Sequence, residues 1–495
     1  MNWCEIKNLQ SVSLDEIPSL EFAELRKQII QKILKGCRVV QFFGDKEMNS
    51  VILYVVLADD EQSKLFVAAS IFEEGGTFES ITPEVKAFHL FEREFYEQFG
   101  IKPEGHPWLK PVRKGIAGVS SEEIQYEFFK MEGEEVHEVG VGPIHAGIIE
   151  PGHFRFSCHG EQIHNLEIEL GFQHRGIENL FLKNKSKPEF LLKLSESIAG
   201  DTVIGHAGTF ARAIESLGNI DVSRRAIVIR TIALEMERIA IHLGDLSALA
   251  GDVAYLTGSA AFGAMRTKVI NSTMLICGSR LGHALIAIGG VNYDINKELG
   301  EKIFQTLTLL EKDVELAAEV LFSSASVLAR FEKTGVVSFE TAKQVGLVGP
   351  AARACGAALD VRTDHPYDGF ALFPVHKFTL KSGDVFARAY IRYVEIIQSI
   401  KIIKELLEST MEGELKKTTS KLLPNKFVVS MSEGWRGEIV HAAITDKAGQ
   451  LKKYKIKDPS FNNWIAVALS VRNNGISDFP LCNKSFNLSY SGFDL

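Results

Sequence analysis

The segment from Val222 to about Leu249 constrains the fold of this chain more than any other feature. As a helix with 3.6 residues per turn, it is apolar over most of its circumference. Within an arc of roughly 100° it carries Arg224, Glu235, Arg238, His242 and Asp245, with Asp252 at the edge if the helix continues. On a surface helix such a stripe is only the solvated face. Here the apolar arc is so wide that the helix should be buried nearly all round, and its charges must be paired inside the protein. We therefore favour a proton path or a cofactor site along this stripe over a purely structural role.

The size and composition of the chain exclude several classes of protein. With 495 residues it is too long for one ordinary core, so we expect two or three domains. No apolar run is long enough to cross a bilayer, and the N-terminus lacks the pattern of a signal peptide. The net charge of −8, without a basic run, argues against nucleic acid as a partner. The six cysteines form no CxxC pair, so we expect reduced thiols and no iron–sulfur cluster on this chain.

The first part of the chain has the pattern of a small α/β domain. A helix is predicted over residues 14–36, followed by strands over 38–43, 51–57 and 65–71. A second helix carries four phenylalanines at helical spacing, which we interpret as a core face; they are Phe88, Phe91, Phe95 and Phe99. We predict a domain over residues 1–118 and an acidic linker over 119–138.

The remainder, residues 139–495, is mainly helical, with long helical patterns over 188–333 and 384–408. Two antiparallel hairpins are predicted beside the helices. One pairs residues 153–158 with 165–170 across the turn HGEQ, and the other pairs 438–445 with 451–456 across DKAGQ. The fold class is therefore α+β, with a small N-terminal α/β domain followed by a mainly helical domain with peripheral β-hairpins.

Three segments could carry chemistry besides the charged stripe. Gly142–Glu178 holds five histidines among glycines, of which His159 and His164 fit the hairpin turn. The interior of Pro188–Glu215 is small, polar and broken by glycines, and DVRTDHPYD at 360–368 is dense in charge. By themselves, Asp201 and His206 in the first of these two segments could be a cap and a loop residue, and DVRTDHPYD could be an ordinary loop. The chain contains no GxGxxG, Walker-type, HExxH or GxSxG motif, so nucleotide binding by this chain is weakly supported.

Several long motifs resemble known families. FEREFYEQFGI and the following GHP resemble the small peripheral subunit of respiratory complex I, the thirty-kilodalton type. Seven further motifs resemble the forty-nine-kilodalton subunit of complex I. They also resemble its relative, the large subunit of membrane-bound [NiFe]-hydrogenases of the formate hydrogenlyase and hydrogenase-4 type. These motifs are GPIHAGIIEPGHFRF, LGFQHRGIE, ALEMERIAIHLGDL, SRLGHALIAIGGV, GLVGPAARACG, DVRTDHPYD and GDVFARAYIRYVEIIQSIKII. The motifs EGWRGEI, DPSFNNW and DFPLCNKSFNLSYSG are most similar to the hydrogenase branch in which both parts are fused. The resemblance implies a domain like the thirty-kilodalton subunit at 1–118, and a domain like the forty-nine-kilodalton subunit or the hydrogenase large subunit at 139–495.

The same resemblance makes a nickel–iron centre improbable. These hydrogenases hold the metals through two cysteine pairs, RxCGxC and DPCxxC. The matching positions here hold Ala199 and Thr202 in the first motif, and Leu481 and Lys484 in the second. Cys482 is displaced by one position and has no partner. A soft metal needs thiolates, which these four residues do not supply, so we expect no metal on this chain and no hydrogenase activity.

The residues that remain match the part of the site that complex I also has. Glu150 matches a glutamate that passes protons in hydrogenases, and Arg436 matches an arginine beside the metal. His145 and Asp252 match residues of the complex I quinone pocket. A second pocket histidine and a pocket tyrosine fall near Ile149 and Gly200, which puts binding of a ubiquinone-like headgroup in doubt. Asp201 and His242 complete the set of catalytic candidates.

Two functional hypotheses follow. In the first, the chain is a subunit of a membrane-associated oxidoreductase on the cytoplasmic side of the membrane. It would form a proton-coupled electron-transfer cavity, with quinone as a possible acceptor. Expected partners are a small Fe–S subunit like the twenty-kilodalton subunit of complex I, a ferredoxin-like Fe–S subunit, and membrane subunits of the complex I or antiporter type. In the second, the chain is a non-catalytic scaffold whose vacated site is simply packed.

Overall fold

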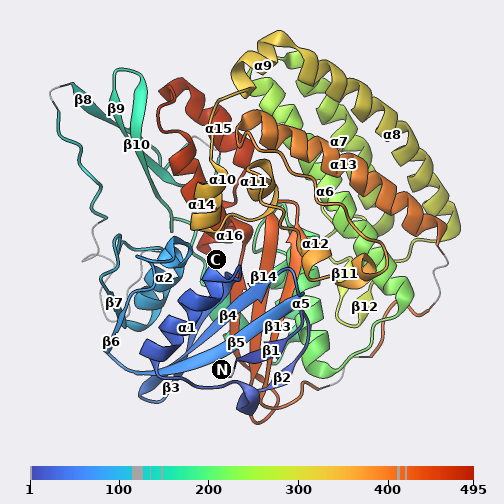
Figure 1. Cartoon of the computed structure of the whole chain (residues 1–495). Coiled ribbons are helices and arrows are strands. Elements are labelled where there is room, and N and C mark those ends of the chain that lie inside the picture. The colour runs from blue at the N-terminus through green and yellow to red at the C-terminus, as the bar shows by residue number, and fades with distance from the viewer. Residues whose placement is uncertain (1–2, 114–125, 134, 146–148, 410–412, 419–420) are drawn as a thin grey trace.

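The computed structural model describes residues 3–113, 126–133, 135–145, 149–409, 413–418 and 421–495. The N-terminal part is built on a four-stranded antiparallel sheet in the order β1-β5-β4-β3 (Figure 1). Its strands are β1 (Cys4–Ile6), β3 (Arg38–Glu47), β4 (Ser50–Asp59) and β5 (Lys64–Glu73). The three strands predicted between residues 38 and 71 are confirmed, and each is longer than predicted.

Two helices cover one face of this sheet, α1 (Phe22–Leu34) and α2 (His89–Phe99). The helix predicted from residue 14 begins later, at Phe22, because a short 3-10 turn (Leu14–Glu16) is followed by extended backbone at Ile17, before Pro18. The predicted core face is confirmed: Phe88, just before α2, and Phe91 and Phe95 of α2 are buried in one apolar cluster, and Phe99 packs against it. The short strands β6 (Thr77–Glu79) and β7 (Lys102–Glu104) pair in parallel beside it.

A second antiparallel sheet, in the order β15-β14-β13-β2, lies at the centre of the molecule. It combines β13 (Lys426–Gly434), β14 (Gly437–Thr445) and β15 (Leu451–Lys457) with β2 (Val12–Ser13) from the start of the chain. The second predicted hairpin is therefore confirmed as a hairpin, but it is not peripheral. All nine residues of β14 are buried, because β14 is covered by the N-terminal sheet on one side and by α5 (Val203–Gly218) on the other.

Aromatic side chains join the two sheets. Tyr54 of β4 stacks between Phe43 of β3, at 5.6 Å between ring centroids, and Phe427 of β13, at 5.7 Å. All three rings belong to one continuous cluster of buried side chains, which also includes apolar residues of α5 and α6 (Arg224–Asp252). The N-terminal sheet and the central sheet thus share a core.

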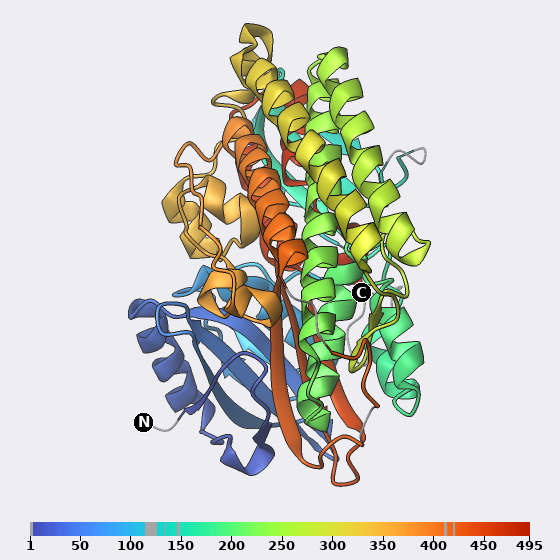
Figure 2. The same ribbon diagram turned by 90° about the vertical axis from the view of Figure 1, so that its right-hand side faces the viewer.

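The long helices stand side by side on the other side of the central sheet (Figure 2). They are α6, α7 (Leu256–Cys277), α8 (Lys297–Ser323) and α13 (Val385–Glu408). Helix α6 is buried along most of its length, as its wide apolar arc predicts. The two ends of the predicted stripe are not buried: Arg224 and Asp252 are exposed at the ends of the helix.

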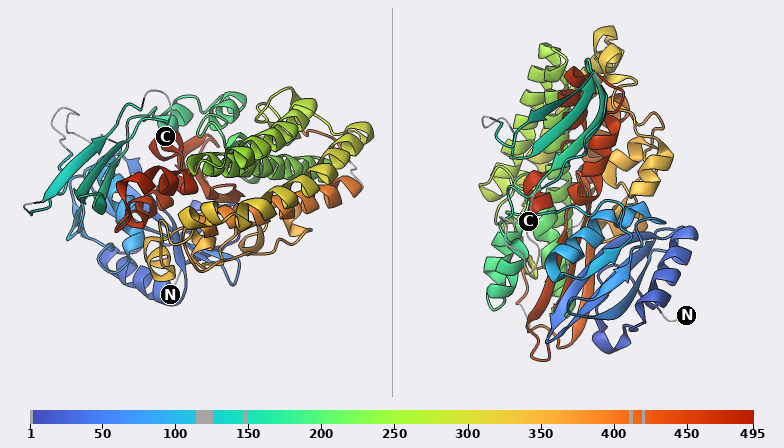
Figure 3. Two further views of the ribbon diagram at one scale, coloured as in Figure 1. Left: turned by 90° about the horizontal axis from the view of Figure 1, so that it is seen from above. Right: turned by 90° about the vertical axis from the view of Figure 1, so that its left-hand side faces the viewer.

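The histidine-rich segment forms the predicted hairpin, β9 (His153–His159) and β10 (Gln162–Glu169). A third strand, β8 (Val136–Val141), pairs with β9, so residues 136–138 of the predicted linker lie in a strand. Residues 119–125 and 134 of that linker lie outside the described part of the chain. Figure 3 shows this sheet beside the C-terminal helices α14 (Pro459–Ser470) and α15 (Phe479–Phe486).

The C-terminal segment after β15 is helical, although its Gly, Pro and Asn content suggests an irregular tail. Asp458 caps α14 by accepting the N–H of Ser460, and Pro459 occupies the first turn. A last short helix, α16 (Tyr490–Asp494), follows α15. The remaining elements connect these parts: α3 (Ile177–Lys183), α4 (Pro188–Ser195), β11 (Ile286–Ala287), β12 (Gly290–Val291), α9 (Ala325–Phe331), α10 (Phe339–Val345), α11 (Gly349–Ala354) and α12 (Val361–Asp364), with 3-10 turns at Lys86–Phe88, Asp368–Ala371 and Ile476–Asp478. In the described part of the chain, no helix has the length and apolar character needed to cross a membrane.

The shared core predicts a large effect of truncating the ring that joins the two sheets. Phe427→Ala removes a fully buried ring between them, so we expect a loss of about 3–5 kcal/mol in the free energy of unfolding. Denaturant unfolding of the purified chain measures this loss. The control is Leu34→Ala, at a site that is 82% exposed, which should change stability by less than about 0.5 kcal/mol. Equal effects of the two substitutions would contradict a shared core.

Candidate functional site

The charged stripe of α6 is paired by residues from distant parts of the chain. Glu235 lies 3.2 Å from Nε of Arg238 and 3.2 Å from Nη1 of Arg362, and it accepts a hydrogen bond from the Ser399 hydroxyl. Arg238 also donates to the backbone oxygens of Glu433, at 2.7 Å, and Gly434, at 3.0 Å. Burial disfavours the charged carboxylate of Glu235, but the two guanidinium groups outweigh it and lower its pKa.

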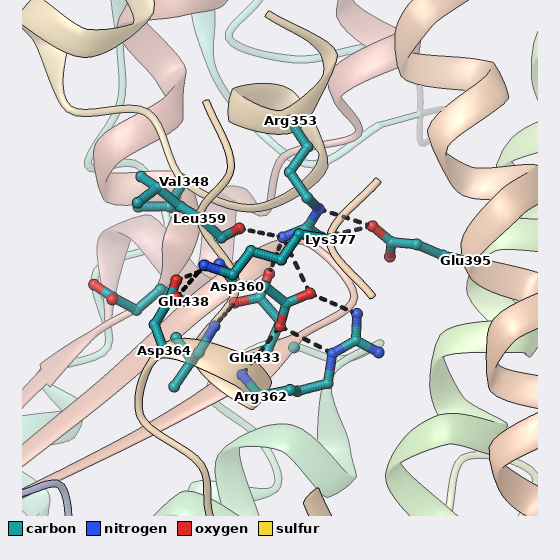
Figure 4. A network of polar contacts seen from close by, with 12 residues as sticks. Val348, Arg353, Leu359, Asp360, Arg362, Asp364, Lys377, Glu395, Glu433 and Glu438 are labelled. Atoms are coloured by element: carbon teal, nitrogen blue, oxygen red, sulfur yellow. Dashed lines mark hydrogen bonds and ion pairs between the residues drawn. The ribbon is translucent and has the colours of Figure 1, made fainter. Parts of the chain in front are cut away.

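A second group of contacts extends this pairing to His242. Nε2 of His242 lies 2.9 Å from a carboxylate oxygen of Glu395 on α13. Arg353 of α11 donates to the other oxygen of Glu395, at 2.6 Å, and to Glu433 of β13, at 2.7 Å. Figure 4 shows Arg353 between these two carboxylates, with Asp360 and Arg362 below it. The pKa of Glu395 is held well below its ordinary value by Arg353 and His242, despite its burial.

Arg436 contacts Asp201 and Thr202, the second of which is one of the four positions that the sequence resemblance matches to metal ligands. Its guanidinium forms a two-pronged ion pair with Asp201, at 2.5 and 2.7 Å, and donates to the hydroxyl of Thr202 at 3.1 Å. Its Nε donates to the backbone oxygen of Asn487 at 2.5 Å. The guanidinium also lies 3.9 Å above the ring of Trp435, whose Nε1 donates to the backbone oxygen of Asp201. Asp201 is therefore an ion-pair partner rather than a helix cap.

Asn487 connects this ion pair to the C-terminal part of the α6 stripe. Its side-chain amide donates to Asp245 at 2.6 Å and accepts from Lys484 at 3.2 Å. Asp245 also accepts from Arg392 at 2.8 Å, and the Lys484 ammonium lies 3.8 Å from it. The segments around residues 201 and 484, far apart in sequence, thus meet in one hydrogen-bonded site, which we call the polar site: Asp201, Thr202, Asp245, Arg392, Arg436, Lys484 and Asn487.

Trp435 lies between the polar site and the buried charges around His242. We call these charges the His242 network: Glu235, Arg238, His242, Arg353, Asp360, Arg362, Glu395 and Glu433. The imidazole of His242 lies edge-on to the Trp435 ring, with 6.2 Å between ring centroids and 90° between ring planes. Arg436 lies against the same indole. The structure therefore brings His242, Asp201 and Arg436 together around a single indole ring, although 41 residues of chain separate Asp201 from His242.

The polar site does not fit a soft metal ion. Thr202 offers a hydroxyl already hydrogen-bonded to Arg436, and Lys484 an ammonium; Ala199 and Leu481 are buried apolar residues. None of them provides the thiolates that a low-valent nickel–iron centre requires. Cys482 lies in the apolar core, where burial raises the pKa of its thiol to about 11.

Glu150 and His145 lie on the loop before the β9–β10 hairpin. Glu150 accepts the backbone N–H of Tyr490 at 3.3 Å. Its charge also acts on Arg175: burial lowers the pKa of the Arg175 guanidinium, and the negative charge of Glu150 opposes this shift. Arg175 donates to the backbone oxygens of Ser197 and Ile198, at 2.6 and 2.9 Å, just before Asp201. The charges of Glu150 and Arg175 interact, but no hydrogen bond or ion pair among the described residues joins Glu150 to the polar site.

His145 is held by its own loop. Its Nε2 lies 2.7 Å from the backbone oxygen of Gly152, and no hydrogen bond within the described ranges joins it to Asp201 or Asp252. Residues 146–148, which follow it, are not described. Asp252 lies at the exposed end of α6. Partial burial raises the pKa of its carboxyl group, and the positive charge of Lys484 opposes that shift. Lys484 therefore faces both Asp245 and Asp252.

Several residues of the site are not among those predicted. Arg353, Asp360 and Arg362 belong to the motifs GLVGPAARACG and DVRTDHPYD, so the second of these is not an ordinary loop. Arg392 and Glu395 lie on α13 on the side that faces α6, and Asn487 follows α15. His206, which could have been a loop residue, is fully buried in α5, 3.0 Å from Asp458 and 3.1 Å from His441. The sequence signal that could have identified Arg392 and Glu395 is the presence of charged residues within the apolar helical pattern of α13.

Comparisons with known proteins give a consistent result. Residues 252–427 match the family model of the respiratory-chain NADH dehydrogenase 49 kDa subunit, and residues 23–113 match that of the 30 kDa subunit. The chain is 28% identical to formate hydrogenlyase subunit 5 of Escherichia coli, over 91% of this chain and 84% of that protein. It is 30% identical to the carbon monoxide-induced hydrogenase of Rhodospirillum rubrum, over 71% of this chain and 97% of that protein.

A solved structure has the same fold. A chain of the membrane-bound sulfane sulfur reductase, an archaeal respiratory membrane complex, superposes with a TM-score of 0.67 at 23% identity, over 73% of this chain and 99% of that one. The fused order of the two family matches, the hydrogenase relatives and the shared fold agree with the resemblance of the sequence motifs. This chain therefore belongs to the family of oxidoreductase subunits that comprises the 30 kDa and 49 kDa subunits of respiratory complex I and the large subunits of membrane-bound hydrogenases.

Proposed function

We propose that this chain forms, with an Fe–S partner subunit, the cavity of a membrane-associated oxidoreductase in which electron transfer to an acceptor is coupled to proton uptake. The observation that carries the proposal is the polar site itself. At the positions where the resemblance places a metal in hydrogenases, this chain has a connected set of charged groups that lies next to His242 across Trp435. The charge of Glu150 acts on Arg175, which binds the backbone just before Asp201. A packed, non-functional site would have no use for so many buried charges.

In this proposal the residues have different tasks. Glu150 passes protons between the solvent side and the polar site, and Asp201 is held in place by the two-pronged contact with Arg436. His242 is a proton acceptor behind Trp435. A quinone-type acceptor is the substrate class that the family suggests, with His145 and Asp252 at its pocket. The chain itself would carry no redox cofactor.

The assembly follows from the family placement. We propose a small Fe–S subunit like the twenty-kilodalton subunit of complex I, a ferredoxin-like Fe–S subunit, and membrane subunits of the complex I or antiporter type as partners. The chain would be peripheral, on the cytoplasmic side of the membrane. The alternative is a scaffold subunit without catalysis, and the buried Ala199 and Leu481 favour it locally, because they fill two former ligand positions with apolar side chains.

Substitution of Glu150 separates these alternatives. Glu150→Gln keeps the shape of the side chain but removes its ability to carry a proton, so we expect acceptor reduction by the assembled complex to fall by about 10²–10⁴-fold. The rate is measured on the purified complex, and assembly is checked by subunit stoichiometry. Glu161→Gln, in the exposed hairpin turn, is the matched control and should leave the rate unchanged. An unchanged rate in Glu150→Gln with normal assembly would favour the scaffold.

Purification of the native complex tests the partners and the missing metal together. Affinity purification with mass spectrometry should recover an Fe–S small subunit and large membrane subunits. Elemental analysis should find iron from the partner clusters but no stoichiometric nickel, because the ligand positions offer no thiolates. Recovery of the chain alone would contradict the proposed assembly, and stoichiometric nickel would contradict the proposed loss of the metal.

A further inference from the structure

The His242 network is a closed set of buried charges. Its members are 2% exposed or less, and they are Glu235, Arg238, His242, Arg353, Asp360, Arg362, Glu395 and Glu433. They come from α6, α11, α13, β13 and the start of α12 with the residue before it, so the fold brings them together from five places in the chain. Two neighbouring pairs are neutral: Arg392 pairs with Asp245, and Lys377 pairs with Asp364. Glu237, which faces Arg238, accepts the backbone N–H groups of Ile204 and Gly205, and burial raises the pKa of its carboxyl to about 8, so we count it as protonated.

The charges of this network do not balance. Three arginines, at 238, 353 and 362, face four carboxylates, at 235, 360, 395 and 433. With His242 neutral and every carboxylate ionised, the network carries one uncompensated negative charge. A buried charge without compensation is costly, and a group in that position normally takes up a proton instead. The count therefore requires one proton in addition to those on the arginines.

Glu433 is the carboxylate with the weakest compensation. Asp360 has a two-pronged contact with Arg362 and the backbone N–H of Arg362, and Glu235 has two arginines and the Ser399 hydroxyl. Among the described residues, the carboxyl group of Glu433 accepts only from Arg353, at 2.7 Å, and from the N–H of Val361, at 3.1 Å. It shares that arginine with Glu395, at 2.6 Å, and Asp360, at 3.6 Å.

The charged surroundings of Glu433 agree with this ranking. Burial and the like charge of Asp360 raise the pKa of Glu433 to about 7, and Arg353 and Arg362 oppose this shift. Tyr367 contacts the backbone N–H of Glu433 and not its carboxyl group. By contrast, Glu438 lies opposite Glu433 on the neighbouring strand and is paired with Arg38 and Lys457, which lower its pKa to about 2.

His242 is the second group that can take the proton. Its Nε2 faces Glu395, while its Nδ1 is buried without a hydrogen-bond partner in the described part of the chain. Glu395 favours a charged imidazole, whereas burial and the charges of Arg392 and Arg238 disfavour it and lower the pKa of His242. Just below pH 7 the imidazole is therefore the empty position and Glu433 the occupied one.

We propose that Glu433 is a protonated carboxylic acid in the resting protein and that Glu433 and His242 hold one exchangeable proton between them. When the Glu433 carboxyl releases its proton, the network becomes negative by one charge, and uptake of a proton at Nδ1 of His242 restores neutrality. Because His242 lies against Trp435, the stored proton is available next to the polar site. The use of this proton in acceptor reduction rests on the proposed function, but its presence in the network does not.

Infrared spectroscopy of the purified complex tests whether Glu433 holds this proton, and it requires no catalytic turnover. The carbonyl stretch of protonated Glu433 should be present below pH 7 and be lost with a midpoint near pH 7. A second such band is expected from Glu237, because burial raises the pKa of that carboxyl to about 8, and this band should remain in the Glu433 variant. Glu433→Gln should remove one such group, whereas the cross-strand control Glu438→Gln should retain it, because Glu438 is ionised. An equal number of protonated carboxyl groups in wild type and Glu433→Gln would overturn the proposal.

A second variant keeps the test valid if Glu433→Gln does not fold. Asp360→Asn retains a side chain that can cap α12 and removes the like charge facing Glu433. The midpoint of the infrared titration should then fall by about one pH unit or more, a tenfold change in proton affinity. An unchanged midpoint would overturn the proposal. Since neither measurement involves turnover, loss of the proposed function in the Glu150 experiment would leave this result unaffected.

Discussion

The pairing of the charges on α6 is the constraint on which the rest of the structure depends. A helix that is apolar on most sides can be buried only if each of its charged residues finds a partner inside the protein. The direct partners come from α12, α13 and β13, and each of these contacts fixes the position of one element relative to α6. Arg353 of α11 then joins two of these partners, Glu395 and Glu433, to each other. The backbone also takes part, because Arg238 binds the carbonyl oxygens at the end of β13. The turn that carries Trp435 and Arg436 is thereby placed beside His242.

The polar site follows from this arrangement. Once the end of β13 is fixed, Arg436 is placed between the segment at 201–202 and the segment at 484–487. An arginine, an aspartate and an asparagine connect these two segments by hydrogen bonds, so polar contacts fix the geometry of this region.

The features that could be predicted are those determined by local periodicity. The strands between residues 38 and 73, the β9–β10 hairpin and the burial of α6 follow from apolar spacing alone. Contacts between distant segments could not be predicted, since nothing near Arg353 or Glu433 in the sequence indicates that they meet. The helices after Asp458 escape prediction because they are short and rich in residues typical of turns, although Asp458 and Pro459 form a recognisable helix start. His145 is a site residue by resemblance, but its loop holds it by a local hydrogen bond that periodicity does not reveal.

The two-residue strand β2 has a consequence for the synthesis of the protein. Val12 and Ser13 pair with Phe427 and Lys426, so the central sheet closes between residues separated by more than four-fifths of the chain. Until the C-terminal strands emerge from the ribosome, the face of the N-terminal sheet that carries Phe43 and Tyr54 has no covering layer. Pairing at such sequence separation forms slowly, and an uncovered apolar face favours aggregation in the meantime. A nascent chain of this protein is therefore a natural client for chaperones from the time its first sheet is complete until its last strands are made.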